Sequence, residues 1–166
     1  RFMVSKASLA HAWDRYGDLS YATQTEAGVL TVSNDAIQKM LSELKTTKDV
    51  SSHVNENIGS KDSHRVSRVL EIVMAGALSL GVSDVHLEPE EAGVRMRYRL
   101  DGVLTEVLMF DHVTYGLVSS RIKLLSGLKL NIKNMAQDGR FSIVVNEKEI
   151  EIRTSILPGN YAETIV

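Results

Sequence analysis

The second half of the chain alternates between helical and strand patterns of apolar residues. Between residues 66 and 78 the apolar positions repeat every three or four residues, which predicts an amphipathic helix. Gly81 follows this segment and favours a left-handed C-terminal cap. Residues 83–88 then alternate apolar and polar side chains up to Pro89, so a short strand is predicted directly after the helix.

A β-hairpin is predicted in the middle of the chain. Residues 94–100 alternate strictly and place apolar side chains on one face and arginines on the other: Arg95, Arg97 and Arg99. The pair Asp101-Gly102 favours a type I′ turn, because both central positions of that turn have positive φ. The returning strand over residues 103–110 places Glu106 opposite Arg97.

The remaining elements of this half complete the pattern. A helix is predicted over residues 112–126, with Gly127 positioned to end it. Strands are predicted over residues 141–145, 150–157 and 161–166, separated by polar turns. Helices interspersed with strands that are joined by short turns indicate an α+β fold with a mainly antiparallel sheet.

Residues 1–60 predict a smaller, mostly helical segment. Helical spacing is present over residues 8–16, again after Ser33 or Asn34, which can cap a helix, and more weakly up to Ile58. A short strand is predicted over residues 28–32.

A polar stretch over residues 59–65 has no apolar period and predicts a linker. We therefore interpret the chain as a segment over residues 1–60 followed by a domain over residues 62–166.

Composition narrows the functional classes. Of 166 residues, 43% are apolar and 24% charged, which is ordinary for a globular protein. The formal net charge of -2 provides no broad basic surface for nucleic acid. The longest mainly apolar stretch, residues 72–82, is far too short to span a membrane. The chain has no cysteine, which excludes disulfides and cysteine nucleophiles, and no glycine is followed by lysine, which excludes a P-loop.

His86 and Glu88 resemble the His-x-Glu element of zinc deaminases. Those sites also need a downstream pair of cysteines, which this chain lacks. Imidazole and carboxylate could still bind zinc together with His64 or His112. Isolated histidines on strands are more often structural, so no metal site is predicted, and no nucleophile motif indicates a catalytic residue.

The arginines of residues 94–100 are a sharper chemical signal. Guanidinium groups on a sheet must be solvated, paired or aimed at an anion, and arginine suits phosphate because its planar fork donates several hydrogen bonds. The pattern leaves open a phosphate-facing patch and a solvated face with pairs such as Arg97 to Glu106. Sheets that bind RNA carry aromatic side chains on the binding face. Here Tyr98 points away from the arginines, so no nucleic-acid partner is predicted.

Five ordered segments carry a resemblance to a known family: residues 81–89, 94–102, 120–123, 137–140 and 152–158. In order and spacing they resemble the N-terminal domain of the type II secretion and type IV pilus assembly ATPases, the GspE/PilB family, upstream of its P-loop ATPase domain. Residues 1–60 are expected to be the end of the variable domain that precedes it in the family. The chain departs from the family pattern at Ala136 and Ala162, where proline and glycine are usual.

The resemblance implies a PAS-like domain with a mainly antiparallel sheet and packed helices, joined to a RecA-like motor domain that lies outside this chain. It implies a cytoplasmic homohexamer, peripheral at the inner face of the cytoplasmic membrane. The implied partners are the chain's own C-terminal motor domain, neighbouring subunits and inner-membrane platform or secretion proteins, without membrane insertion. ATP and Mg²⁺ are the expected cofactors of the parent ATPase, and neither is expected to bind this chain tightly. The chain alone is not expected to hydrolyse ATP.

The resemblance also implies roles for particular residues. The candidates for contact with nucleotide phosphates or with a subunit interface are Arg97, Arg99, Arg121 and Arg140. The residues of the motifs expected to be structural are Ser83, Asp84, His86, Glu88, Asp101, Gly102, Gln137, Asp138 and Gly139.

Two functions follow from these observations. The first is a domain that supplies arginines to the nucleotide at an interdomain cleft and transmits ATP-driven domain motion. The second is a PAS-like protein-interaction or ligand-sensing module that docks a membrane-platform partner. Tight ATP binding by this chain alone would favour the second, because the first leaves the phosphate cradle of backbone amides in another domain.

Overall fold

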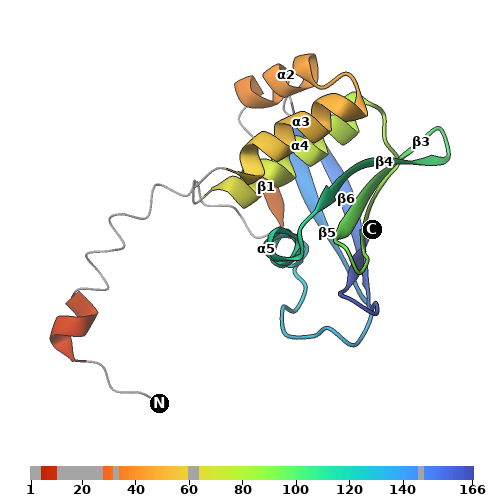
Figure 1. Ribbon diagram of the computed structural model, residues 1–166. Coiled ribbons are helices and arrows are strands. Elements are labelled where there is room, and N and C mark those ends of the chain that lie inside the picture. The colour runs from red at the N-terminus through yellow and green to blue at the C-terminus, as the bar shows by residue number, and fades with distance from the viewer. Residues whose placement is uncertain (1–4, 11–27, 32–33, 60–63, 146–147) are drawn as a thin grey trace.

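The computed structural model describes residues 5–10, 28–31, 34–59, 64–145 and 148–166 (Figure 1). Residues 6–10 are helical. Most of the helix predicted over residues 8–16 lies outside the described residues, as does the predicted cap Ser33. From there the elements follow in the order β1 (Val29–Thr31), α2 (Asn34–Glu43), α3 (Thr47–Ile58), α4 (Arg65–Ser79), β2 (Asp84–Pro89), β3 (Val94–Leu100), β4 (Val103–Phe110), α5 (His112–Leu125), β5 (Gln137–Val145), β6 (Lys148–Leu157) and β7 (Thr164–Ile165).

The described strands form one sheet in the order β1-β5-β6-β7-β2-β3-β4. Neighbouring strands are antiparallel, except that β1 runs parallel to β5. The shortest strand of the second half, β7, lies in the middle of the sheet between β6 and β2. The predicted α+β class with a mainly antiparallel sheet is confirmed, and its PAS-like identity stays a prediction.

Helices α2 to α5 lie on one side of the sheet (Figure 1). Figure 1 shows α2, α3 and α4 stacked together, with α5 viewed end-on below them. On β3, the buried Tyr98 hydroxyl donates a hydrogen bond of 2.6 Å to the Val73 carbonyl of α4. Gly76 of α4 lies against α3, because a Cβ at this position would be 2.5 Å from Val50 Cγ2. The missing side chain of Gly76 therefore allows α3, α4 and β3 to approach closely.

The elements before the predicted linker contribute to the same core. Their buried apolar side chains pack in one cluster with those of α4 and the sheet: Leu30, Ile37, Leu44, Val50 and Val54. The Ser79 hydroxyl of α4 also donates to the Leu41 carbonyl of α2 at 3.2 Å. The division of the chain at residues 59–65 stays a prediction.

The predicted hairpin is confirmed in its turn and its register. Asp101 has φ of 48° and Gly102 has φ of 81°, as a type I′ turn requires. Arg97 lies opposite Glu106. The left-handed glycine after α4 is also confirmed, since Gly81 has φ of 66°.

Several strand boundaries differ from the predictions by one or two residues, as for β2 and for β6, which begins at Lys148 instead of residue 150. Two strands differ by more. β5 begins at Gln137 instead of residue 141. Its first four residues are polar or glycine, so the sequence shows no alternation of apolar and polar side chains there. Gly139 is needed there because a Cβ would collide with the Ser126 carbonyl oxygen. β7 covers only Thr164–Ile165 of the predicted residues 161–166, and Glu163 just before it contacts α5 instead.

Candidate functional site

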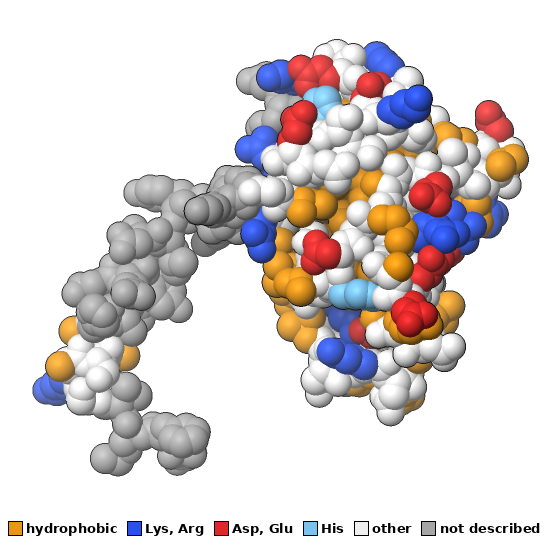
Figure 2. Space-filling model, viewed as in Figure 1, with side chains coloured by type: hydrophobic (Ala, Val, Ile, Leu, Met, Phe, Trp, Pro, Cys, Tyr) orange, Lys and Arg blue, Asp and Glu red, His pale blue; other side chains and the backbone are white. Residues whose placement is uncertain are grey.

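The sheet face that points away from the helices carries a ladder of charged side chains. Every second register pair of β2 and β3 lies on this face: Asp84 with Arg99, His86 with Arg97, and Glu88 with Arg95. Figure 2 shows basic and acidic side chains side by side on the part of the molecule where β3 and β4 lie. The motif residues of β2 thus form one side of a ladder whose other side is the predicted arginine face.

Every arginine of β3 is paired with a carboxylate. The pairs are Arg95 Nη2 with Glu90 Oε2 at 2.9 Å, Arg97 Nη2 with Glu88 Oε1 at 2.6 Å, and Arg99 Nε with Asp84 Oδ2 at 3.4 Å. Glu106, the register partner of Arg97, instead lies 3.6 Å from Arg95 Nε, because Glu88 occupies the Arg97 guanidinium. Half-exposed pairs of this kind contribute up to about 1 kcal/mol each. They also leave little free positive charge for an anion.

His86 belongs to the same ladder. Its Nδ1 lies 3.3 Å from Glu88 Oε1, the carboxylate that also binds Arg97. Within the described ranges, no three His, Asp or Glu side chains are grouped closely enough to hold a metal ion.

A second pair of arginines lies further along the same sheet. Arg140 of β5 and Arg153 of β6 are direct register partners, and their side chains are 76% and 90% exposed. Both lie near one acid, Glu151, at 3.2 Å and 3.6 Å. Two guanidiniums that share one carboxylate leave a net positive charge on this solvent-facing part of the sheet. Like charges directly opposite each other also repel, which is unfavourable.

Arg140 is predicted from the sequence as a candidate for phosphate contact, and Arg153 is not. A signal for Arg153 was present, because it lies in the segment 152–158 of the resemblance and on the polar face of an alternating strand. What the sequence did not show is the register of β5 with β6, which brings the two arginines together.

Arg121 lies on α5, apart from the sheet arginines. Its Nε is buried and has no hydrogen-bond partner in the described part of the chain. Its charge acts on Glu71 of α4: burial raises the pKa of Glu71, and the nearby Arg68 and Arg121 partly oppose that rise. The four predicted arginines therefore occupy three separate places: the ladder, the β5–β6 face and the helical layer.

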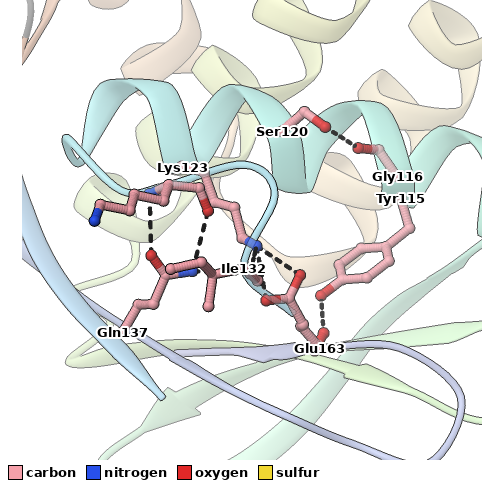
Figure 3. A network of polar contacts seen from close by, with 8 residues as sticks. Tyr115, Gly116, Ser120, Lys123, Ile132, Gln137 and Glu163 are labelled. Carbon is pink, nitrogen blue, oxygen red and sulfur yellow. Dashed lines mark hydrogen bonds and ion pairs between the residues drawn. The ribbon is translucent and has the colours of Figure 1, made fainter. Parts of the chain in front are cut away.

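A buried ion pair joins α5 to the segment before β7 (Figure 3). Lys123 is 2% exposed, and its Nζ donates to both carboxylate oxygens of Glu163 at 2.7 Å. The same Nζ donates to the Ile132 carbonyl at 2.9 Å. The Tyr115 hydroxyl donates to the Glu163 backbone carbonyl, and burial, followed by the Glu163 charge, raises the pKa of Tyr115.

Gln137 extends this network into the loop between α5 and β5. Its side-chain oxygen accepts from the Lys129 N–H at 3.0 Å, and its Nε2 donates to the carbonyls of Lys129 and Ile132 at 3.1 and 3.0 Å. Gln137 therefore satisfies backbone groups that the loop cannot pair by itself. The segments 120–123 and 137–140 and Glu163 meet in one network, although they are far apart in the sequence.

The remaining motif residues shape turns and strand contacts. Asp101 and Gly102 form the hairpin turn. The Ser83 hydroxyl donates to Asp84 Oδ2 at 2.8 Å. Asp138 accepts from the Ser155 hydroxyl of β6 at 2.6 Å, beside the two exposed arginines.

The family model described as "Type II/IV secretion system protein" matches residues 59–166, so the chain belongs to the type II/IV secretion ATPase family.

The chain matches only a small part of each of its longer relatives. The chain is 27% identical over 165 residues to the "Type IV pilus assembly ATPase PilB" of Myxococcus xanthus, which is 99% of this chain and 28% of that protein. It is 32% identical over 109 residues to the "Type II secretion system protein E" of Klebsiella pneumoniae, covering 66% and 22%. It is 37% identical over 106 residues to the protein of the same title from Pseudomonas aeruginosa, covering 64% and 21%. The chain thus spans about a quarter of the length of these relatives.

None of the helices that the structure describes is long and apolar enough to cross a membrane.

Proposed function

We propose that this chain is the N-terminal domain of a secretion or pilus assembly ATPase, and that it brings arginines to a nucleotide held mainly by a separate motor domain. The observation that carries this proposal is the exposed pair of Arg140 and Arg153, opposed across β5 and β6 with Glu151 as their shared acid.

The chemistry of phosphate favours such a pair. Negative charge on a transferring phosphoryl group spreads over its outer oxygens, and guanidinium groups bind these oxygens through two parallel hydrogen bonds. Two opposed guanidiniums repel each other, and the single carboxylate of Glu151 balances only one of their charges. A phosphate between Arg140 and Arg153 would relieve that repulsion and add charge-assisted hydrogen bonds.

The other candidate arginines have different roles in this proposal. Arg97 and Arg99 brace the sheet through Glu88 and Asp84, since these carboxylates already occupy their guanidiniums. Arg121, on the helical layer, suits an interface with a neighbouring subunit of a homohexamer.

In the parent protein, ATP and Mg²⁺ bind at the cleft between this domain and the motor domain. Closure of the cleft adds the arginine contacts, and hydrolysis withdraws them, so the two domains move against each other. Inner-membrane platform proteins would receive this motion at the cytoplasmic face of the membrane.

The test is ATP turnover by a full-length protein that contains this chain, measured on verified hexamers. We expect Arg140→Ala and Arg153→Ala each to lower turnover by about tenfold or more, because single arginines at a transferring phosphoryl group contribute large rate factors. The matched control is Arg95→Ala, which removes the same charge from the same sheet face at a paired position. It should leave turnover within about twofold, since half-exposed ion pairs contribute little. Wild-type turnover in both Arg140→Ala and Arg153→Ala would refute the proposal.

A further inference from the structure

The two exposed arginines are held unequally by their shared acid. Arg140 Nη1 donates to Glu151 Oε2 at 3.2 Å. Arg153 Nε lies 3.6 Å from Glu151 Oε1, which is beyond hydrogen-bond distance, and its side chain is 90% exposed. Glu151 therefore occupies the guanidinium of Arg140 and leaves that of Arg153 largely open to solvent.

The pair lies in a hollow of about 600 Å³ on the sheet. On this face it is the middle one of three successive register pairs: Asp138 with Ser155, Arg140 with Arg153, and Ser142 with Glu151. Asp138 is a second acid in the hollow, but its Oδ1 accepts from the Ser155 hydroxyl at 2.6 Å. Of the described acids, Glu151 is the one in contact with the two guanidiniums.

The backbone beneath the pair is fixed from the helical side. Thr154, the neighbour of Arg153, is buried, and its hydroxyl accepts from the Ser126 hydroxyl at 3.0 Å, just after the end of α5. Gly139, the neighbour of Arg140, packs so closely that a Cβ there would lie 2.4 Å from the Ser126 carbonyl oxygen. A change at the pair should therefore involve the exposed side chains and not a shift of the strands.

Carboxylate and phosphate compete for the same donors of an arginine. Both accept hydrogen bonds from the fork of guanidinium N–H groups. An exposed ion pair such as Arg140 with Glu151 contributes little to stability, so it exchanges readily, and exposed side chains change rotamer within nanoseconds. A phosphate that reaches Arg153 can therefore displace Glu151 from Arg140 and bind both arginines.

We propose that Glu151 is an internal competitor for the phosphate of a bound nucleotide. It holds Arg140 while the site is free, leaves that guanidinium when a phosphate engages both arginines, and returns to it as the phosphate departs. This inference rests on the proposed function, because it requires that the arginine pair binds phosphate. It adds to that function a residue whose role is to weaken phosphate binding and hasten release.

The two arginines then have different tasks. Arg153, whose guanidinium is open, makes the first contact with phosphate, and Arg140 joins when Glu151 has left it. Binding is weakened because only the molecules with Arg140 free are competent for the contact with both arginines. The effect of Glu151 on phosphate binding should thus depend on Arg140, which would not be so for a glutamate with a merely structural role.

The test measures binding of inorganic tripolyphosphate, as a probe for the phosphate chain of a nucleotide, to this chain and its variants. Titrations followed by NMR of the arginine Nε–Hε groups give the dissociation constant, at about 0.15 M salt to screen distant charges. The matched control for Glu151→Gln is Glu149→Gln, which removes the same charge from the same face of β6, about 7 Å further along the strand. Thermal unfolding of each variant verifies that the fold is intact.

We expect Glu151→Gln to tighten binding by about threefold or more, because the competing carboxylate is gone. Glu149→Gln should change binding by less than about 1.5-fold, because its charge lies further from the pair and is screened. Arg140→Ala and Arg153→Ala should each weaken binding. When Arg140 is already alanine, adding Glu151→Gln should tighten binding by less than about 1.5-fold, because no guanidinium at position 140 remains to be occupied.

Equal tightening by Glu151→Gln and Glu149→Gln would indicate a general effect of charge and would overturn the proposal. Unchanged binding by Glu151→Gln, or an equal gain with and without Arg140, would overturn it too, while weaker binding by Arg140→Ala and Arg153→Ala would leave the proposed function standing. If neither the wild type nor Glu151→Gln binds tripolyphosphate, this inference fails, and ATP turnover by the full-length variants still tests the proposed function separately.

Discussion

At the scale of single residues, Lys123 and Glu163 are the most strongly buried charges of the described molecule. Their separate removal should be costly, because each would leave the other charge buried without a partner. We expect Lys123→Met and Glu163→Gln each to lower the free energy of unfolding by about 3–5 kcal/mol. The measurement is urea denaturation of this chain, which gives that free energy by linear extrapolation.

The double variant separates pairing from burial. Lys123→Met combined with Glu163→Gln should cost clearly less than the sum of the single changes, because no uncompensated charge remains. Arg140→Ala, at an exposed position, serves as the control and should change stability by no more than about 0.5 kcal/mol. Additive costs would contradict a direct ion pair.

The sequence could not predict this pair, although Lys123 lies in a segment that carries the family resemblance. The two residues are separated by 40 positions, and a lysine near the end of a helix is usually exposed. The arginine ladder was more accessible to sequence analysis, because strict alternation along β3 places its arginines on one face. The alternation could not identify the acid that binds each arginine, since that depends on β2 as well as β4.

At the scale of elements, the start of α5 depends on one side chain. Asp111 Oδ1 accepts from the Thr114 N–H at 2.8 Å. Hydrogen bonds from the Thr114 side chain, and then from its backbone, lower the pKa of Asp111. We expect Asp111→Ala to destabilise the chain by about 1 kcal/mol at neutral pH, as loss of an N-cap does, and Asp111→Asn to cost less because it keeps an acceptor.

The pH dependence of this cap has a defined sign. A carboxyl whose pKa is lowered on folding stabilises the native state above its unfolded pKa, and this contribution is lost as pH falls through the folded value. The stability difference between wild type and Asp111→Ala should therefore shrink in acid. Urea denaturation at several pH values measures it, and a difference that stays constant down to strongly acidic pH would rule out an ionised cap.

Elements with local chemical signals were predicted well, and elements without them were not. The turn Asp101-Gly102 fixed the hairpin and its register, because few residue pairs accept positive φ at both positions. The start of β5 was missed because Gln137 and Gly139 show no apolar alternation. Their strand conformation depends instead on the contact of Gly139 with Ser126 and on the loop that Gln137 pairs.

At the scale of the whole molecule, the parallel pairing of β1 with β5 could not be read from the sequence. The two strands are separated by four helices and three strands of the described chain, and a three-residue strand such as β1 contains no signal that selects its neighbour. The pairing places residues 29–31 at the edge of the sheet formed by the second half. The predicted division at residues 59–65 can therefore be tested by asking whether the two parts are stable separately.

The last prediction concerns this dependence. A chain of residues 65–166 should be several kcal/mol less stable than a chain of residues 28–166, because it lacks α2, α3 and the residues between them, whose buried side chains pack in one core with those of α4. The loss includes buried Val50, Val54 and Leu44, and fully burying each such side chain contributes about 1.5–3 kcal/mol. Thermal unfolding and urea denaturation of both chains provide the comparison. An equally cooperative transition with an unchanged midpoint in the shorter chain would show instead that residues 65–166 form an independent domain, and that a folding boundary lies near residue 59, where the family match begins.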